Sequence, residues 1–515
     1  MTLAHNPFKP SSTLPTLADI QRRRRELLAF QARQPLAQAT PPPAEAEEES
    51  PLEEHSRLAP NQEDPEEQEE YEEAQEPYPD EDPELSAAYP PASSAPPPPT
   101  LADPALYGLA GLAVRSLAPQ TEADPAAVLL QFLAAFGNLV GPAPHCRVGS
   151  TRHGLNLFLV LVGESSKARK GTSWRQISSL FAAVDPAWAA RRVTTARPNA
   201  NSLIRALRDQ QPATDRRLFL LSEEFASLLR VLGRETGQLS PLLRCAWDGG
   251  DLCAHDGLRL LEATAAHISL VGHVTQSELA HHLSRTESHN GFANRCLWAS
   301  VRRSKSLPDG GCLAPEQQSA LASELRRTLD WVHSQKEILI SRTPAARELW
   351  NDRYPALSQG REDVYGAATS RAEAQVLRLS AIYAALDCTP LVDVCHLHAA
   401  LAVWDYCLAS TRLLFDTAPI DPTARRISQA LDVSPEGLSR FQIRSLFHRH
   451  VGKERIDLAL EQLMDLGLIN SKTHVGRGRP ATLWAKAPET KDANGGTYGA
   501  YGAHFFPQPD QGTRQ

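Results

Sequence analysis

The feature that most constrains the fold is a run of almost entirely apolar residues, LNLFLVLVG, at 155–163. A strand made from it has apolar side chains on both faces, so neither face could lie against water. Strands of this kind belong in the middle of parallel sheets that helices cover on both sides. Further apolar runs at 217–224, 267–274 and 294–301 are separated by segments long enough for crossover helices. The sequence therefore predicts an α/β fold with a parallel sheet.

The segment after the first run, GESSKARKGTSW, has the order of groups that phosphate binding requires. Backbone N–H groups of the turn and of the following helix N-terminus would face the phosphates, and Lys170 would reach the β- and γ-oxygens. Thr172 or Ser173 would bind Mg²⁺, and Thr172 is preferred. The predicted nucleotide-binding residues are Gly163, Glu164, Ser165, Lys170, Gly171, Thr172 and Ser173.

The loop departs from the G-x-x-x-x-G-K-[ST] pattern in two respects. It is one residue longer, and Arg169 stands where the second glycine would be. A solvated basic loop between a strand and a helix is the alternative interpretation.

Two carboxylates, Glu223 and Glu224, end the second apolar run. The carboxyl end of a neighbouring strand is where the attacking water and the magnesium shell would lie, so Glu223 is predicted to orient or deprotonate that water and to contact the metal. Glu224 would face either the metal or solvent. The alternative is a pair of charges at a helix N-terminus.

Other polar groups lie beside the later strands. His273 lies at the end of the third run and Gln276 follows it, and both are suited to sensing a γ-phosphate, although His273 is equally compatible with a core histidine. Arg295 precedes the last strand. It is either an arginine finger that acts on a neighbouring subunit's nucleotide or a member of a structural ion pair.

The C-terminal region, 422–487, has the pattern of three helices followed by a β-hairpin, which is typical of a winged helix. The hairpin turn carries Arg477 and Arg479 between glycines, and these side chains could meet DNA phosphates or a narrow minor groove. Lys453, Arg455 and Lys472 would lie nearby. A winged helix that docks protein is the alternative.

Charge is unevenly distributed along the chain. Residues 44–84 contain 19 Asp and Glu against one basic residue, so the remainder is basic (+10) although the whole chain carries −8. Residues 1–100 are acidic and Pro-rich and are predicted to be disordered, except for a docking or transient helix over 17–34. The acidic segment either competes with DNA for the basic body or serves as a solvated spacer.

The predicted organisation is a disordered region (1–100), a helical part of the ATPase module (101–144), the α/β core (145–312), a helical subdomain (313–418), the winged helix (422–487) and a disordered tail (488–515). The eight cysteines show no zinc-binding spacing. No signal peptide and no run of about 18 apolar residues occurs. A cytoplasmic protein with no membrane contact is expected.

Five stretches, DPAAVLLQFLAAFGNLVGP, NLFLVLVGESSKARKGTSW, LLSEEFASLL, GFANRCLW and RAEAQVLRLSAIYAALD, together resemble a family of P-loop proteins from bacteria, plasmids and phages. The domain that members of this family share has long been classified as a domain of unknown function. Its members look like the helicase half of primase-helicases, with a RecA-like ATPase core. The resemblance covers roughly residues 102–487, and KARKGTSW is its most specific piece.

By that resemblance the loop residues Gly163, Lys170, Gly171 and Thr172 match the family's nucleotide loop. Glu223 matches the acidic strand end, and Arg295 the Asn-Arg pair before the last strand. Arg371 and Arg378, seven residues apart on one helical face, also match the family pattern. Members of this family often follow a primase-polymerase module. The N-terminal hundred residues here are predicted not to fold into such a module, so priming activity is not expected.

Three functions are compatible with the sequence. The first is an ATP- and Mg²⁺-dependent DNA helicase or translocase, a homo-oligomer such as a ring, that serves replication of a mobile element or phage beside a primase or other replication proteins. The second is a nucleotide-switched DNA-binding initiator or regulator that unwinds nothing. The third is a DNA-binding scaffold with a degenerate loop, which Arg169 favours. Sustained DNA-stimulated ATP turnover separates the first from the second.

Overall fold

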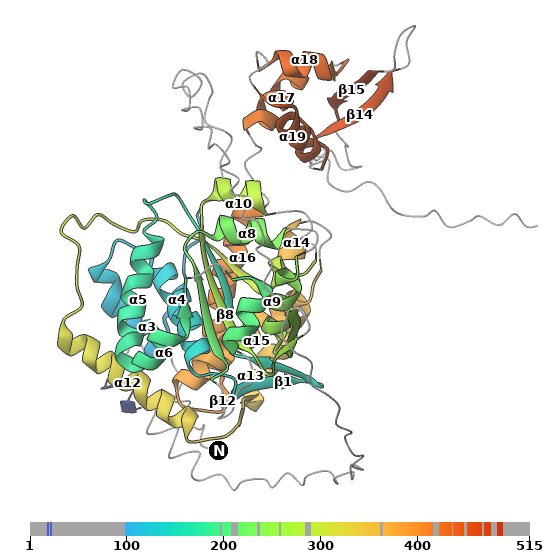
Figure 1. Cartoon of the computed structure of the whole chain (residues 1–515). Coiled ribbons are helices and arrows are strands. Elements are labelled where there is room, and N and C mark those ends of the chain that lie inside the picture. The colour runs from blue at the N-terminus through green and yellow to red at the C-terminus, as the bar shows by residue number, and fades with distance from the viewer. Residues whose placement is uncertain are drawn as a thin grey trace, which may run out of the picture. The chain divides into compact units, whose positions relative to one another are not determined.

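The computed structural model (Figure 1) describes most of the chain after residue 97. The described ranges are 18–19, 21–22, 98–195, 198–207, 215–233, 237–256, 259–283, 290–360, 364–415, 422–434, 436–447, 451–465, 468–474 and 481–487. The chain divides into two units, 1–97 and 98–515. In the first unit, Nη2 of Arg22 donates to Oδ1 of Asp19 at 3.1 Å within a helical stretch. Apart from these few positions and residues 98–100, the regions predicted to be disordered lie outside the described residues.

Five parallel strands form the central sheet, in the order β4-β5-β8-β3-β9. They are β3 (Phe158–Val162), β4 (Val193–Thr194), β5 (Arg217–Ser222), β8 (His267–Val274) and β9 (Cys296–Ser300). Every residue of β3 and β8 is buried, as expected for strands that are covered on both faces. The predicted α/β fold with a parallel sheet is confirmed.

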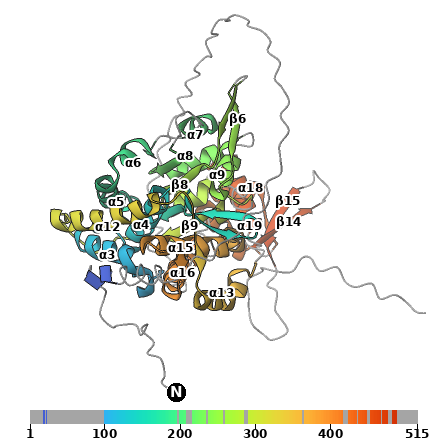
Figure 2. The same ribbon diagram turned by 90° about the horizontal axis from the view of Figure 1, so that it is seen from below.

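Helices cover both faces of this sheet. One face packs against α3 (Gly108–Leu117), α4 (Pro125–Leu139), α5 (Lys170–Val184) and α6 (Pro186–Arg191). The other packs against α7 (Ala200–Leu207), α8 (Phe225–Leu232), α9 (Leu239–Asp248) and α10 (Gln276–His282). Figure 2 shows α7, α8 and α9 on one side of β8 and β9, and α4 on the other. The side chains of β3 alternate between the two hydrophobic clusters, which is why this strand reads as a continuous apolar run.

The described residues between 313 and 415 form a mainly helical segment. Its helices are α12 (Pro315–His333), α13 (Pro344–Leu357), α14 (Val364–Thr369), α15 (Ala372–Leu386) and α16 (Val394–Phe415). Short 3-10 helices lie earlier in the chain, at Asp103–Leu106, Ala118–Gln120 and Ala293–Arg295. Residues of α12, α15 and α16 belong to the same hydrophobic cluster as α4 and one face of the sheet. The helical segment predicted at 313–418 therefore shares a core with the sheet. Among the described residues, no helix is long and apolar enough to cross a membrane.

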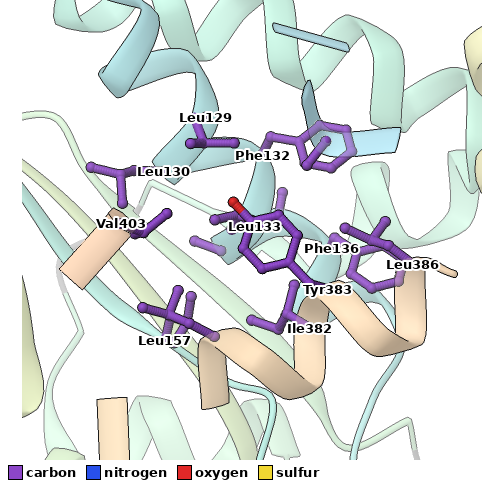
Figure 3. Packing of buried hydrophobic residues seen from close by; sticks show 14 of the residues in the cluster. Leu129, Leu130, Phe132, Leu133, Phe136, Leu157, Ile382, Tyr383, Leu386 and Val403 are labelled. Carbon is purple, nitrogen blue, oxygen red and sulfur yellow. The ribbon is translucent and has the colours of Figure 1, made fainter. Parts of the chain in front are cut away.

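The helix α4 lies at the centre of this shared core. The carboxylate of Asp124 caps it by accepting from the N–H of Ala126 at 2.9 Å, and Pro125 occupies the first turn, as the Asp-Pro pair predicts. All of its residues after Pro125 are buried. Figure 3 shows Phe132, Leu133 and Phe136 of α4 close to side chains of α15. Such a helix, which carries apolar side chains on every face, is stable only when it is enclosed on every side.

The strand β1 (Pro144–Val148) lies at the start of the predicted α/β core but is not part of the central sheet. It pairs antiparallel with β2 (Thr151–Gly154) and parallel with β10 (Ile338–Leu339) in a separate three-stranded sheet. Further two-stranded pairs are β6 (Leu252–Asp256) with β7 (Arg259–Ala263), and β11 (Ser341–Arg342) with β12 (Leu391–Val392). The parallel partner of β1 lies far along the chain, so no local pattern could have identified it.

The C-terminal residues form a small unit with its own core. It consists of α17 (Pro422–Asp432), β13 (Leu438–Ser439), α18 (Arg440–Ser445), α19 (Lys453–Asp465), β14 (Ile469–His474) and β15 (Ala481–Lys486). The strands pair antiparallel in the order β13-β15-β14. Their core includes Ile427, Ile443, Leu460 and Trp484. The three helices and the hairpin predicted here are present, with the short strand β13 added.

Candidate nucleotide-binding site

The loop of residues 163–169 joins the carboxyl end of β3 to α5. The N–H of Gly163 donates to the carbonyl of Val274 at 3.1 Å, which continues the pairing of β3 with β8. A Cβ at position 163 would lie 2.3 Å from the carbonyl oxygen of Val301. Because that oxygen belongs to the backbone, only glycine fits at the start of the loop.

Lys170 is the first residue of α5, and its amine lies over the loop. The Nζ atom donates to the carbonyl of Gly163 at 2.6 Å and to that of Glu164 at 3.3 Å. Burial lowers the pKa of Lys170. Glu164 and Ser165 are both exposed. The lysine is therefore partly desolvated, and its ammonium group is held by acceptors that phosphate oxygens could replace.

The structure distinguishes the two hydroxyls that follow. Ser173 is fully buried, accepts from Nε2 of Gln131 at 2.5 Å and donates to the carbonyl of Lys170 at 2.6 Å. Its hydroxyl therefore faces α4 and the core, which does not support the prediction that Ser173 binds nucleotide. Thr172 is half-buried and remains the hydroxyl expected to contact Mg²⁺.

Arg169 replaces the second glycine of the standard pattern but keeps a backbone conformation typical of glycine. Its backbone is left-handed, with φ 55° and ψ 30°, which is a conformation that glycine adopts freely. For other L-residues the left-handed conformation costs roughly 1–2 kcal/mol. The Nε atom of Arg169 donates to Oε2 of Glu122 at 2.6 Å. The arginine thus adopts the backbone geometry that a glycine would supply, and an ion pair holds its side chain.

The connections of β3 and β8 diverge at this edge of the sheet. The chain leaves β3 toward the face that packs on α4, where α5 lies, and leaves β8 toward the opposite face, where α10 lies. In open α/β sheets, ligands bind outside the carboxyl ends of adjacent strands whose connections diverge in this way. The loop at 163–169 therefore lies where this topology favours ligand binding.

Glu223 lies close to the start of α5. A Cβ built on Gly171 would be 3.6 Å from Oε1 of Glu223, so this carboxylate and the lysine loop share one edge of the sheet. Glu224 is the exposed N-cap residue of α8, and its side chain makes no capping hydrogen bond. The structure thus places the Glu223 carboxylate beside Gly171, in the first turn of α5.

The end of β8 contributes a buried histidine. His273 is 4% exposed, and among the described residues its Nε2 has no hydrogen-bond partner. Burial, followed by the nearby charge of Lys170, lowers the pKa of His273 to about 4, so the ring is neutral at pH 7. Gln276, at the first position of α10, is half-buried.

Glu278 is a charged neighbour of Lys170 that the sequence reasoning missed. It forms a capping box with Thr275: its carboxylate accepts from the Thr275 N–H at 2.9 Å, and Thr275 Oγ1 accepts from the Glu278 N–H at 3.2 Å. Burial raises its pKa, but the hydrogen bonds from Thr275 and the charge of Lys170 outweigh this and lower it overall. The T-x-x-E spacing of a capping box was the signal that could have identified it.

Arg295 lies at the amino end of β9, on the opposite edge of the sheet from the loop. It is 7% exposed, and its Nη2 donates to Oδ2 of Asp248 at 2.5 Å. Arg371 donates to Oδ1 of the same carboxylate at 3.1 Å, and the guanidinium of Arg378 stacks on Trp247 at 3.7 Å. Of the two alternatives for Arg295, the described residues show the structural ion pair.

Replacing Arg295 and Arg371 separately tests this assignment. Arg295→Ala removes a buried side chain beside Trp247 and one of the two arginine partners of Asp248, so a loss of about 2 kcal/mol in unfolding free energy is expected, mainly from lost packing. Arg371→Ala removes a side chain that is 35% exposed and should cost less than about 1 kcal/mol. Denaturant unfolding measures both. Abolished ATP hydrolysis by Arg295→Ala with unchanged stability would instead support the arginine finger.

The predicted DNA-binding residues are divided between described and undescribed positions. Lys453 and Arg455 lie at the start of α19, Lys472 lies in β14, and all three are exposed. Arg477 and Arg479 lie outside the described residues. Solvent exposure of the three described basic residues is what contacts with DNA phosphates would require.

Several residues that contact the predicted residues gave no recognisable signal in the sequence. Glu122 precedes α4 and contacts Arg169. The guanidinium groups of Arg295, Arg371 and Arg378 lie over the ring of Trp247, and the first two also donate to Asp248. These contacts join segments far apart in the chain, and no spacing rule relates them. Neither a protein-family model nor a curated protein matches this sequence.

Proposed function

We propose that the protein is an ATP-hydrolysing P-loop enzyme with a RecA-like core that acts on DNA. The observation that carries the proposal is the grouping of Lys170, Thr172 and Glu223 around one helix N-terminus, at the edge of the sheet where connections diverge. A lysine, a hydroxyl and a carboxylate are the groups that binding and cleaving a nucleoside triphosphate needs. A parallel five-stranded sheet covered by helices on both faces is compatible with a RecA-like domain.

The residues at this edge fit a nucleotide with Mg²⁺. The first N–H groups of α5 have no acceptors within the helix, and Arg169 at its N-cap position supplies no side-chain cap. The buried Nε2 of His273 can donate to or accept from a ligand atom. Thr172 and Glu223 would hold the metal ion, which neutralises phosphate charge when bound.

The side chains at this edge of the sheet would have different roles in hydrolysis. Lys170 exchanges its two loop carbonyls for β- and γ-phosphate oxygens. Glu223 orients the attacking water and accepts its proton, with Glu224 as the alternative carboxylate. His273 and Gln276 at the end of β8 contact the γ-phosphate region and distinguish triphosphate from diphosphate.

The C-terminal unit supplies the proposed DNA contact. Three helices and an antiparallel hairpin support a winged helix, in which α19 would enter the major groove and the turn with Arg477 and Arg479 would meet the backbone. The exposed side chains of Lys453, Arg455 and Lys472 would contact phosphates. Such a module would hold DNA for a helicase or translocase, acting as a homo-oligomer in replication of a mobile element or phage.

Removing two of these charges should weaken DNA binding in a salt-dependent manner. The variant Lys453→Ala/Arg455→Ala is expected to lower affinity and to reduce the slope of log K against log salt by about 2, because two DNA phosphates would no longer be neutralised. Fluorescence anisotropy with labelled duplex DNA at several salt concentrations measures both. Glu461→Ala, also exposed on α19, is the matched control and should not reduce affinity. An unchanged slope in the double variant would favour a protein-docking module.

A nucleotide-switched initiator or regulator is the second candidate. It is favoured by the burial of Arg295 against Asp248, which leaves no described arginine assigned to a neighbouring subunit's nucleotide. ATP hydrolysis by the purified protein, with and without single-stranded DNA, separates the candidates. Sustained turnover that DNA stimulates supports the motor, and slow unstimulated turnover supports the switch. Absence of both binding and hydrolysis would leave only a DNA-binding scaffold.

A further inference from the structure

The loop at 163–169 depends on a backbone conformation that its own residue disfavours. In the G-x-x-x-x-G-K pattern, glycine precedes the lysine and adopts a positive φ without steric cost. Here Arg169 has φ 55°, immediately before Lys170. A contact that holds the side chain of Arg169 from outside the loop would offset this cost.

Glu122 provides that contact from outside the loop. Its Oε2 accepts from Nε of Arg169 at 2.6 Å, and its Oε1 accepts from the N–H of Leu307 at 2.7 Å and from Nη2 of Arg303. The hydrogen bond from Leu307, followed by that from Arg303, lowers the pKa of Glu122 to about 2, so the group is ionised at neutral pH. Both carboxylate oxygens are thus occupied by donors from separate segments.

The backbone of Glu122 is fixed as well. Its carbonyl accepts from the N–H of Ser304 at 2.9 Å and from the hydroxyl of Ser304 at 3.1 Å. The residue is 8% exposed and stands two positions before Asp124, which caps the buried helix α4. Glu122 is therefore an anchor that cannot easily follow Arg169 if the loop changes conformation.

We propose that Glu122 is a positioning residue for the nucleotide loop. It acts through Arg169: the ion pair holds position 169 in the left-handed conformation, so that the first N–H groups of α5 and the amine of Lys170 face the phosphates. Glu122 and Arg169 together stabilise the left-handed backbone conformation that a single glycine adopts in the standard pattern. This inference rests on the proposed nucleotide function, but the conformation of the loop is testable without it.

The test uses three variants of the full chain: Glu122→Gln, Arg169→Gly and the double substitution. Glu122→Gln is expected to weaken binding of a fluorescent ATP analogue roughly tenfold, the size of coupling found within one contact network. It should also accelerate hydrogen exchange of the loop amides in the absence of nucleotide. Arg169→Gly should bind nearly as well as the wild type, because glycine needs no anchor. Glu316→Gln, exposed on α12, is the control and should change neither measurement.

The double variant decides between a positioning and a merely structural role. If Glu122 acts through Arg169, then Glu122→Gln should have little effect on affinity or loop exchange once residue 169 is glycine. Equal losses in both backgrounds, or no loss in the single variant, would overturn the proposal. If the wild type binds no nucleotide, the proposed function fails, whereas the loop-exchange comparison still decides the role of Glu122.

Discussion

Lys170→Ala is expected to reduce ATP hydrolysis by roughly 100-fold or more, the effect seen when one preorganised donor to a developing anion is removed. Lys170 is the first residue of α5, and its Nζ donates hydrogen bonds to the loop carbonyls of Gly163 and Glu164. Alanine keeps the helix but leaves the β- and γ-oxygens without their cation. Steady-state phosphate release, with single-stranded DNA present, measures the loss.

The matched control is Lys167→Ala, which removes an exposed lysine from the same loop. It carries the same change in charge and should retain most of the activity. If both variants lose activity equally, general basicity of the loop is responsible, which favours the solvated-loop interpretation. If Lys170→Ala remains active, the assignment of the site is wrong.

Glu223→Gln is expected to lower turnover by about 100-fold or more while nucleotide binding persists, because a general base contributes to the chemical step. The carboxylate lies near Gly171 at the start of α5, where a water attacking the γ-phosphate would need a base. Glutamine keeps the shape of the side chain but cannot accept the proton. Single-turnover hydrolysis, together with the affinity for an ATP analogue, separates chemistry from binding.

Glu224→Gln is the control for this substitution, since it changes the adjacent exposed carboxylate at the N-cap position of α8. Near-normal turnover is expected from it. Loss in Glu224→Gln with activity retained in Glu223→Gln would transfer the role of base to Glu224. Loss of nucleotide affinity in Glu223→Gln would point to metal binding as its main role.

Much of the fold was predictable because it depends on local patterns. The strand at 158–162 is apolar on both faces, so burial in a parallel sheet followed from its composition alone. The Asp-Pro pair at 124–125 marked the start of α4, and the C-terminal sequence indicated three helices and a hairpin. Each of these signals lies within a few residues of the element that it predicts.

The candidate site was predictable only in part. Gly163 and Lys170 follow one strand within eight residues, so a short motif identifies them. The sequence left Thr172 and Ser173 as alternatives because a helix turns adjacent side chains about 100° apart, and only packing against Gln131 shows that the Ser173 hydroxyl faces the core. Glu122 gave no signal, because its contact with Arg169 depends on the placement of α4 beside α5.

The sequence by itself thus determined the class of fold, the strand that carries the loop and the residue types that could meet a phosphate. These depend on hydrophobic periodicity and on short spacings, which act along the chain. The tertiary structure alone decided the order of the strands, the pairing of β1 with β10 and the burial of Arg295 against Asp248. Such contacts join residues far apart in the chain, and their free energy depends on burial and on partners that no local pattern encodes.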